Sequence, residues 1–202
     1  LTFVAAPSAR AQASGTLTFG LSSYPPSFEP LKSTGTAAGT VKLLIHRGLL
    51  SYDKDGALRG ELAEEWGVDE SGVWTFRLRE GAKWHDGRPV TSADVRYTIE
   101  TGAAKESAAA YKTFLASISK IETPDARTIR LTFSQPTATA ETVFGHYNMP
   151  IIPEGSDPEG LVGAGPFKLE GRERGVSIDL VANEDYYKPG LPKLSHIRMV
   201  AY

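Results

Sequence analysis

The histidines are the first residues of this sequence to consider for chemistry, because imidazole can bind metals or transfer protons near neutral pH. The chain has four, and they lie far apart: His46, His85, His146 and His196. None has the HxxxH or HExxH spacing of a helical metal site, and the chain contains no cysteine. We therefore predict no metal site and assign His85 to the structure of a loop.

The segment Gly163-Ala164-Gly165 is glycine-rich, as phosphate-binding loops are. Pro166 removes a donor N–H from it, and the chain has neither a GxGxxG nor a GxxxxGK pattern. A turn or a close approach of two backbone segments explains these glycines better. The GxSxG elbow of a serine nucleophile is also missing. The sequence thus predicts no catalytic residue, no cofactor and no enzymatic activity.

Paired carboxylates occur at Glu64-Glu65 and at Asp69-Glu70. They fall in a stretch that we predict to be a polar connection between strands, where a solvated surface explains them better than acid–base chemistry does. Arg77 and Arg79 occupy the polar positions of the strand that follows, and we expect them to be exposed or paired with these acids.

The overall composition excludes several kinds of partner. The chain has 202 residues, of which 41% are hydrophobic and 23% charged, and its formal net charge is -2. Such a balance predicts a globular protein without affinity for nucleic acid. No apolar run approaches the roughly 18 residues that a membrane span needs. Without cysteine there can be neither a disulfide nor a lipid-bearing thiol.

The first residues resemble the end of a secretory signal. A short apolar segment, 1–6, precedes the small-residue patterns Ala9-x-Ala11 and Ala11-x-Ala13, which fit a cleavage site. We predict that residues 1–13 are a residual signal peptide and that the protein is exported to the periplasm after cleavage.

Alternating apolar residues predict most of the strands. Leu17, Phe19 and Leu21 indicate the first one, and the prolines after it make 22–30 an ordered loop. Thr36 is expected to cap a helix that Gly48 ends. Further strands are predicted at 49–52, 74–78, 129–133, 167–170, 176–180 and 196–201.

Turn and capping residues place the remaining elements. Asp86-Gly87 should form a turn in which glycine takes a positive φ. Thr91 and Asp94 approximate a capping box, so a helix should begin near Ser92. Further predicted elements are an amphipathic helix with Tyr111, Phe114, Leu115 and Ile118 on one face, a turn at 123–126, a short helix at 139–144 and a loop at 157–165. Strands and helices are mixed without a regular βαβ repeat, which predicts a mixed α/β (α+β) fold.

One long stretch resembles a known family. Residues 62–100 contain LAEEW and then VWTFRLREGAKWHDGRPVTSADVRYTIE, which is similar to the signature of the family 5 extracellular solute-binding proteins. These are the dipeptide, oligopeptide and nickel-binding proteins of bacterial ABC importers. Residues 49–52, 163–169 and 183–194 resemble the family's GLL-Y, GTGPY and NPDYW…P-LD segments, with Ala164 and Phe167 as departures.

The resemblance implies a type II periplasmic binding protein fold, of which this chain would form the N-terminal lobe portion. Residues 14–49 would then be part of a large, ligand-contacting subdomain, and 50–153 a small N-terminal subdomain. Residues 154–202 would return to the large subdomain and end before a second lobe.

The resemblance also implies a function. Two lobes of such a protein close on a solute by hinge motion, and the closed form docks on the permease subunits of an ABC transporter. A short peptide is the default solute, and nickel chelates, glutathione, opines and sugars also occur in the family.

Polar or aromatic residues on loops at strand ends are the candidates for ligand contacts, because binding residues concentrate on such loops. For each, a structural role is equally open. The predicted ligand-binding residues are Ser22, Ser23 and Tyr24, then His146, Tyr147 and Asn148, and then Ala164, Gly165 and Phe167.

Two other interpretations stay open at this point. A truncated lobe would expose apolar surface and could act as a protein-interaction or chaperone-like module without a transport ligand. A secreted enzyme is the second alternative, although no nucleophile signature supports it.

Overall fold

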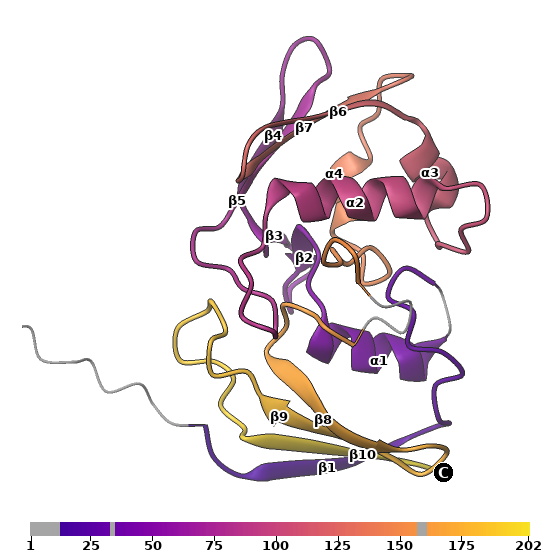
Figure 1. Cartoon of the computed structure of the whole chain (residues 1–202), viewed down its shortest axis with the longest axis vertical. Coiled ribbons are helices and arrows are strands. Elements are labelled where there is room, and N and C mark those ends of the chain that lie inside the picture. Colours follow the sequence, from indigo (N-terminus) through magenta and orange to yellow (C-terminus); the bar gives the residue numbers. More distant parts are fainter. Residues whose placement is uncertain (1–12, 33–34, 157–160) are drawn as a thin grey trace, which may run out of the picture.

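The computed structural model describes residues 13–32, 35–156 and 161–202, so the predicted leader lies, apart from Ala13, outside the described residues. The strands form two four-stranded sheets and one two-stranded hairpin. Figure 1 shows one sheet at each end of the molecule, with helices and the hairpin between them. The mixed α/β class predicted from the sequence is confirmed.

The lower sheet of Figure 1 joins the two ends of the described chain. Its strand order is β1-β10-β9-β8, and β1 runs parallel to β10 with Thr16 opposite His196 and Leu21 opposite Ala201. The other neighbours are antiparallel. The C-terminal ends of β1 and β10 therefore lie side by side at the same end of the sheet. The bounds are Thr16–Leu21 for β1, Phe167–Glu173 for β8, Ser177–Ala182 for β9 and His196–Ala201 for β10.

Helix α1 (Thr36–Ile45) packs on this sheet. Its N-cap is Gly35, with φ 89°, so Thr36 is the first helical residue and the predicted Thr36 cap is wrong. The predicted end at Gly48 is also wrong, because His46 already has extended backbone. The core between helix and sheet contains Leu21, Phe28, Ala37, Val41, Ile45, Phe167, Ile178, Leu180, Ile197 and Met199.

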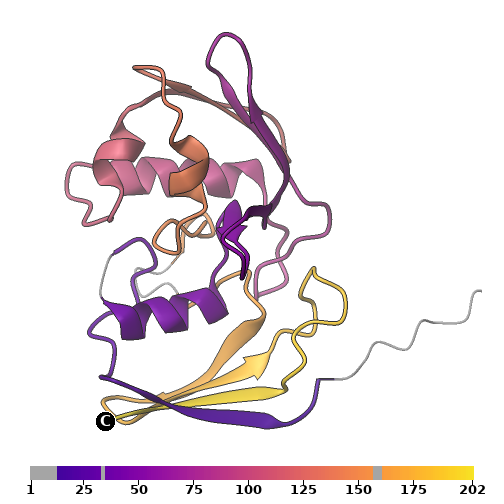
Figure 2. The same cartoon turned by 180° about the vertical axis from the view of Figure 1, so that it is seen from behind.

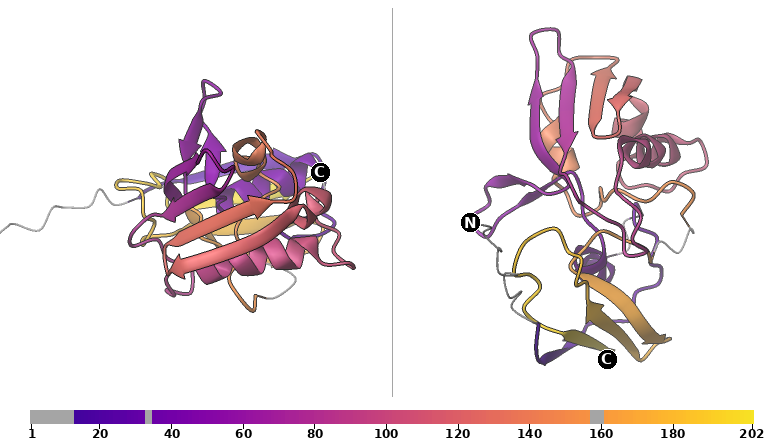
Figure 3. Two further views of the ribbon diagram at one scale, coloured as in Figure 1. Left: turned by 90° about the horizontal axis from the view of Figure 1, so that it is seen from above. Right: turned by 60° about the vertical axis from the view of Figure 1, so that its left-hand side comes forward.

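The upper sheet is antiparallel throughout, in the order β4-β5-β7-β6. Helices α2 (Ser92–Ala103) and α3 (Lys112–Ala116) pack against it, and Figure 3 shows α2 running beneath its strands. Figure 2 shows the hairpin of β2 (Leu50–Tyr52) and β3 (Leu58–Gly60) between the two sheets. The remaining bounds are Ala63–Val68 for β4, Trp74–Leu78 for β5, Ile118–Asp125 for β6, Thr128–Phe133 for β7 and Ala140–Phe144 for α4.

The predicted helix through Ile118 is too long. The Ser117 N–H donates to Phe114 O, α3 ends at Ala116, and Ile118 instead begins β6 opposite Phe133. The turn predicted at 123–126 is also misplaced, because Pro124 belongs to β6. This strand lies at the edge of the sheet, where a proline that cannot donate a hydrogen bond is tolerated.

Glu64 and Glu65 lie on β4, so the prediction that they belong to a polar connection between strands is wrong. Glu64 pairs with Arg127 at 2.6 Å and with Arg77 at 3.6 Å. The predicted pairing of Arg77 with an acid is thus confirmed. Strands β3 and β4 were not predicted, because β4 buries only Ala63 fully and its charged positions hide the alternation.

The start of α2 at Ser92 is confirmed. The Asp94 carboxylate accepts the Thr91 N–H at 2.7 Å, as a capping residue does. The same buried carboxylate accepts hydrogen bonds from Trp84 Nε1 at 3.3 Å and from the Glu154 N–H at 2.8 Å. Asp94 therefore fixes the helix start to the preceding turn and to the segment after residue 150.

Gly87 provides a test of the predicted turn, because its φ is 89° and an added Cβ would meet no atom within 4 Å. Gly87→Val should therefore lower the free energy of unfolding by about 1–3 kcal/mol through backbone strain alone. Gly67→Val is the matched control, since Gly67 lies on β4 with equally open space and no positive φ. Equal stability of both variants in urea unfolding would contradict the assignment.

Candidate functional site

The loop after β1 begins at the end of the sheet where the C-terminal ends of β1 and β10 lie side by side. Ser22 and Ser23 are exposed, and Tyr24 is half-buried with its ring edge-on to Phe28 at a centroid distance of 5.9 Å. The Tyr202 N–H donates to Leu21 O at 3.3 Å. Any chain that continues from Tyr202 therefore starts beside this loop.

Tyr24 lines a pocket of about 290 Å³, which we call the loop pocket. The guanidinium of Arg172 lies over the Phe28 ring, 5.2 Å from its centroid. Arg172 lies at the end of β8 and Arg174 in the turn after it, and no pattern in the sequence singles them out. The pocket is lined by Tyr24, Pro25, Pro26, Ser27, Phe28, Arg172 and Arg174.

The second predicted group follows α4. Tyr147 is 41% exposed and its ring stacks on that of His146 at 4.5 Å. The Tyr147 ring also covers Gly39 of α1, whose added Cβ would lie 2.9 Å from it. Asn148 is buried, and its Oδ1 lies 3.5 Å from Lys42 Nζ.

His146 and Tyr147 line a second pocket, of about 400 Å³, which we call the helix pocket. Two further exposed apolar side chains line it, Leu43 and Tyr52. The loop pocket and the helix pocket share no residue, so the first and second predicted groups do not form one site within this chain.

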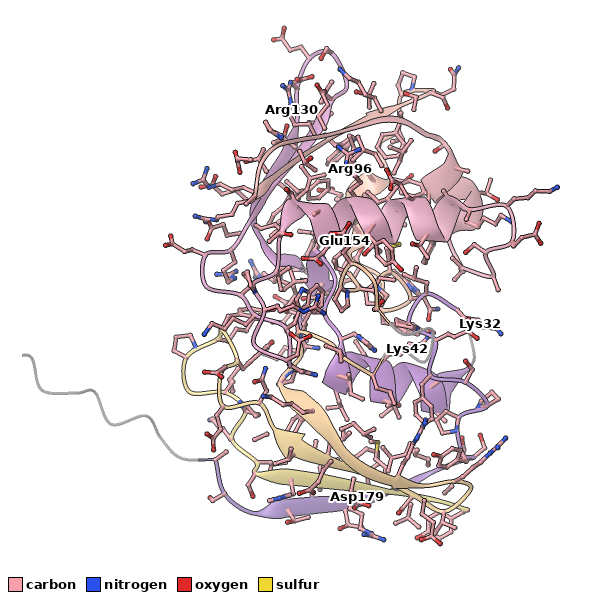
Figure 4. The ribbon with its side chains drawn as sticks, viewed as in Figure 1. Lys32, Lys42, Arg96, Arg130, Glu154 and Asp179 are labelled. Atoms are coloured by element: carbon pink, nitrogen blue, oxygen red, sulfur yellow. The ribbon has the colours of Figure 1, made fainter. Side chains whose placement is uncertain are left out.

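Lys42 lies between the helix pocket and the segment before α1. Its amine donates to Lys32 O, and Figure 4 shows the two labelled lysines on neighbouring segments. Burial lowers the pKa of Lys42 to about 8, although the charge of Glu29 partly opposes this shift. Lys42 therefore anchors α1 to two other segments rather than presenting a free amine.

The third predicted group is in the interior. Ala164, Gly165 and Phe167 are buried. The Gly165 N–H donates to Ile45 O at 2.8 Å, and an added Cβ on Gly165 would lie 2.5 Å from that oxygen. The structure thus surrounds these residues with protein atoms, and the close backbone approach considered from the sequence is present.

Glu61, between β3 and β4, is a buried carboxylate that the sequence analysis did not select. Only 6% of the residue is exposed. It accepts hydrogen bonds from Lys188 Nζ at 2.6 Å, Tyr187 OH at 2.7 Å and Ser51 Oγ at 2.8 Å, and Arg47 Nε lies 3.5 Å away. The only signal in the sequence is a single acid placed directly before the apolar pair at 62–63.

The charge state of this cluster follows from its surroundings. Burial raises the pKa of Glu61, but the hydrogen bond from Lys188 and the charge of Arg47 outweigh it and lower the pKa below its ordinary value. Burial and the Glu61 charge raise the pKa of Tyr187 well above its ordinary value. Glu61 is thus an anion at neutral pH, and it connects the segments at 47, 61 and 187–188.

His85 makes a second connection between the two sheets. The Gly163 N–H donates to its Nδ1 at 3.2 Å, and its Nε2 lies 3.0 Å from Gly165 O. A neutral ring with the proton on Nε2 satisfies both contacts. The structural role predicted for His85 is therefore confirmed.

The contact of His85 with the 163–165 segment predicts that the stability of the fold depends on pH. Burial lowers the pKa of His85 to about 4, against the ordinary value of 6.5 that applies when the chain is unfolded. The folded state thus binds fewer protons than the unfolded state. The contribution of the neutral His85 ring to the free energy of unfolding is therefore complete above pH 6.5 and is lost as the pH falls towards 4. Urea unfolding should show a loss of about 3 kcal/mol across this range.

His85→Gln should remove this part of the pH dependence, because it cannot titrate. His196→Gln is the matched control, since His196 is more exposed and lies 3.8 Å from Glu170 at the surface. Identical pH profiles for wild type and His85→Gln would refute the assignment.

In the described ranges, no helix combines the length and apolarity needed to cross a bilayer. The same ranges contain no group of three His, Asp or Glu side chains placed to hold a metal ion. The predicted ligand residues thus lie at the loop pocket, at the helix pocket and in the interior, and the Glu61 and His85 contacts connect the two sheets.

Comparison with known proteins gives the family. The family model of the bacterial extracellular solute-binding proteins, family 5 (middle), matches residues 57–202. A Brucella ovis protein named as an ABC transporter peptide-binding protein is 30% identical over 96% of this chain and 39% of its own length. The glutathione-binding protein GsiB of Escherichia coli K12 is 27% identical over 84% of this chain and 35% of its own.

Solved structures agree with this fold. The binding protein AgaA of A. tumefaciens R10, in complex with agropinic acid, is 42% identical with a TM-score of 0.88 over 93% of this chain and 40% of that one. MoaA of the same strain, in complex with mannopinic acid, is 30% identical with a TM-score of 0.84. The type II binding-protein fold expected from the resemblance is confirmed.

The chain spans about 40% of the length of these relatives. The family is described as one of extracellular solute-binding proteins, and its Brucella ovis relative is named as a peptide-binding protein of an ABC transporter. With a model match over residues 57–202 and a fold shared with AgaA, this chain belongs to the bacterial extracellular solute-binding proteins of family 5.

Proposed function

We propose that this chain is part of the periplasmic solute-binding component of an ABC importer. Its full-length form would bind a small solute between two lobes and deliver it to the permease subunits. The observation that supports this most directly is that β1 and β10 end at one edge, with the Tyr202 N–H bonded to Leu21 O. A second lobe that followed Tyr202 would then face the loop at 22–24.

The proposed arrangement of subdomains follows the same logic. Residues 14–49 and 154–202 would form the large subdomain, and 50–153 the small one. Two hydrophobic cores, one at each sheet, support this division, and Leu31, Leu49 and Ala164 extend the core of the upper sheet into the large subdomain. The Glu61 and His85 contacts would hold the two subdomains together as one rigid lobe, so that closure would occur at the connection to the other lobe.

For the solute, we propose a small acid derived from amino acids, either an opine-like compound or a short peptide. AgaA and MoaA were solved with agropinic acid and mannopinic acid, and the Brucella ovis and Escherichia coli relatives are named for peptides and for glutathione. Among the predicted ligand residues, we propose that Ser22, Ser23 and Tyr24 contact the solute, since they directly follow Leu21, whose carbonyl oxygen accepts the Tyr202 N–H. We also propose export through a cleaved signal peptide, as the pattern at 1–13 predicts.

The test is native mass spectrometry of the full-length protein isolated from the periplasm of its own cells. A small retained adduct is expected, and isothermal titration calorimetry with agropinic acid, mannopinic acid and di- or tripeptides should reproduce the binding. A protein without an adduct that binds none of these probes would refute the proposal. Crosslinking of the loaded protein to its permease would test delivery separately.

A further inference from the structure

Phe28 joins the loop at 22–30 to the core of the lower sheet. The residue is 9% exposed, and it belongs to the hydrophobic core that also contains Val41 of α1 and Ile178 of β9. The Tyr24 ring meets the Phe28 ring edge-on, with a centroid distance of 5.9 Å and an angle of 83° between the ring planes. Tyr24 itself is only partly buried. The Phe28 ring therefore connects a half-buried side chain of the loop to the core beneath it.

The backbone between these two rings has little freedom. Pro25 and Pro26 fix their own φ angles, and Pro25 also restricts the backbone of Tyr24 before it. Ser27 Oγ then accepts the Glu29 N–H at 3.1 Å, which closes a local turn. With the backbone restricted in this way, the freedom that Tyr24 retains lies in its side-chain torsions.

Contact with Phe28 limits those torsions, because two aromatic rings favour an edge-on arrangement over most others. Phe28 is in turn held by β8, since the Arg172 guanidinium lies 5.2 Å from its ring centroid. Arg172 is opposite Ile178 in the pairing of β8 with β9, and Ile178 is fully buried. The ring that holds Tyr24 is thus fixed both by the core and by the end of β8.

We infer that Phe28 is a positioning residue for solute binding, which holds the Tyr24 ring in the orientation in which that ring meets the solute. The inference rests on the proposed function, in which Tyr24 contacts the solute, and it assigns to Phe28 no solute contact of its own. A side chain that must be ordered on binding lowers the affinity, whereas one that is already ordered does not. Freeing the Tyr24 ring should therefore weaken solute binding by roughly 3- to 10-fold.

The experiment is a double-mutant cycle, measured by isothermal titration calorimetry on the full-length protein. The variants are Phe28→Leu, Tyr24→Ala and the double variant, and the probes are agropinic acid, mannopinic acid and the dipeptide Ala-Ala. Phe28→Leu keeps an apolar side chain in the core but removes the ring that Tyr24 contacts. It should weaken binding by roughly 3- to 10-fold in the wild-type background. In the Tyr24→Ala background it should weaken binding by less than about twofold, because no ring is left to position.

Phe76→Leu is the matched control for the loss of a core ring. Phe76 is fully buried in the core of the upper sheet. Its variant should lower the Tm as Phe28→Leu does, yet it should bind the probes as wild type does. If Phe28→Leu does not fold, Phe28→Met replaces it in the cycle, because the unbranched methionine side chain fills irregular space in a core.

The possible failures are distinguishable. If Phe28→Leu binds every probe within about twofold of wild type, Phe28 does not position Tyr24. If Phe28→Leu weakens binding by the same factor with and without the Tyr24 ring, its effect does not act through Tyr24, and the inference is overturned. Wild-type affinity of Tyr24→Ala would overturn the inference and leave the proposed solute binding standing. A wild-type protein that binds none of the probes would overturn both.

Discussion

Glu61→Gln is expected to lower the free energy of unfolding by about 3 kcal/mol, the lower end of the range for breaking a buried ion pair. The substitution keeps the shape of the side chain but removes the charge that Lys188 and Arg47 face at 2.6 and 3.5 Å. The lower end applies because the Lys188 side chain is 34% exposed and can turn partly to water. Tyr187 OH would retain a neutral acceptor.

Glu65→Gln is the matched control, because Glu65 is exposed on the neighbouring strand β4. It should change stability by less than about 0.5 kcal/mol. Chemical denaturation of both variants at neutral pH measures the difference. A Glu61→Gln protein as stable as the control would show that the cluster does not hold the two sheets together.

Gly165→Ala is expected to cost about 3 kcal/mol, the upper end of the usual range for overpacking. The new Cβ would lie 2.5 Å from both Leu44 O and Ile45 O, which are backbone atoms that cannot rotate away. Relief would require α1 to separate from the 163–165 segment. That shift would also disturb the contacts of His85 Nε2 and Asn183 Nδ2 with Gly165 O, each at 3.0 Å.

Gly171→Ala controls for the change of residue type. Gly171 lies on β8, has no positive φ, and offers open space to a Cβ. Its variant should be as stable as wild type or slightly more so. If Gly165→Ala were equally harmless, the close approach of the two backbones would be refuted. The Gly165 variant should also lose much of the pH dependence assigned to His85, which gives the prediction a second readout.

Local patterns predicted those elements that local physics determines. Trp74, Phe76 and Leu78 alternate because one face of β5 is buried, and all three are in the core. The start of α2 was predictable because every helix leaves its first N–H groups without a partner inside the helix, and the capping box of Thr91 and Asp94 forms at that position. The helical spacing that ends at Ile118 failed because pairing of β6 with β7 overrides a local preference.

The candidate site was predictable only in part, because its contacts join distant segments. The loop at 22–24 could be selected from its position after a strand. Nothing in the sequence brings Arg172 over Phe28, or Lys188 to Glu61, since these pairs are set by the packing of the sheets. Tyr24 and His146 line separate pockets, and this separation likewise follows from how the sheets are arranged rather than from any local sequence pattern.

The parallel pairing of β1 with β10 also sets an order in which the chain can fold. Thr16 pairs with His196, which lies 180 residues later in the chain. The first strand of the chain is therefore among the last to pair. Closing so long a loop is entropically costly and slow, whereas two pairings of the upper sheet, β4 with β5 and β6 with β7, join strands that are neighbours in sequence. We expect the upper sheet to become structured first and to present Glu61 and His85 as a template on which the ends of the chain assemble. Pulse-labelled hydrogen exchange during refolding would then show protection at β5 and β7 before protection at β1.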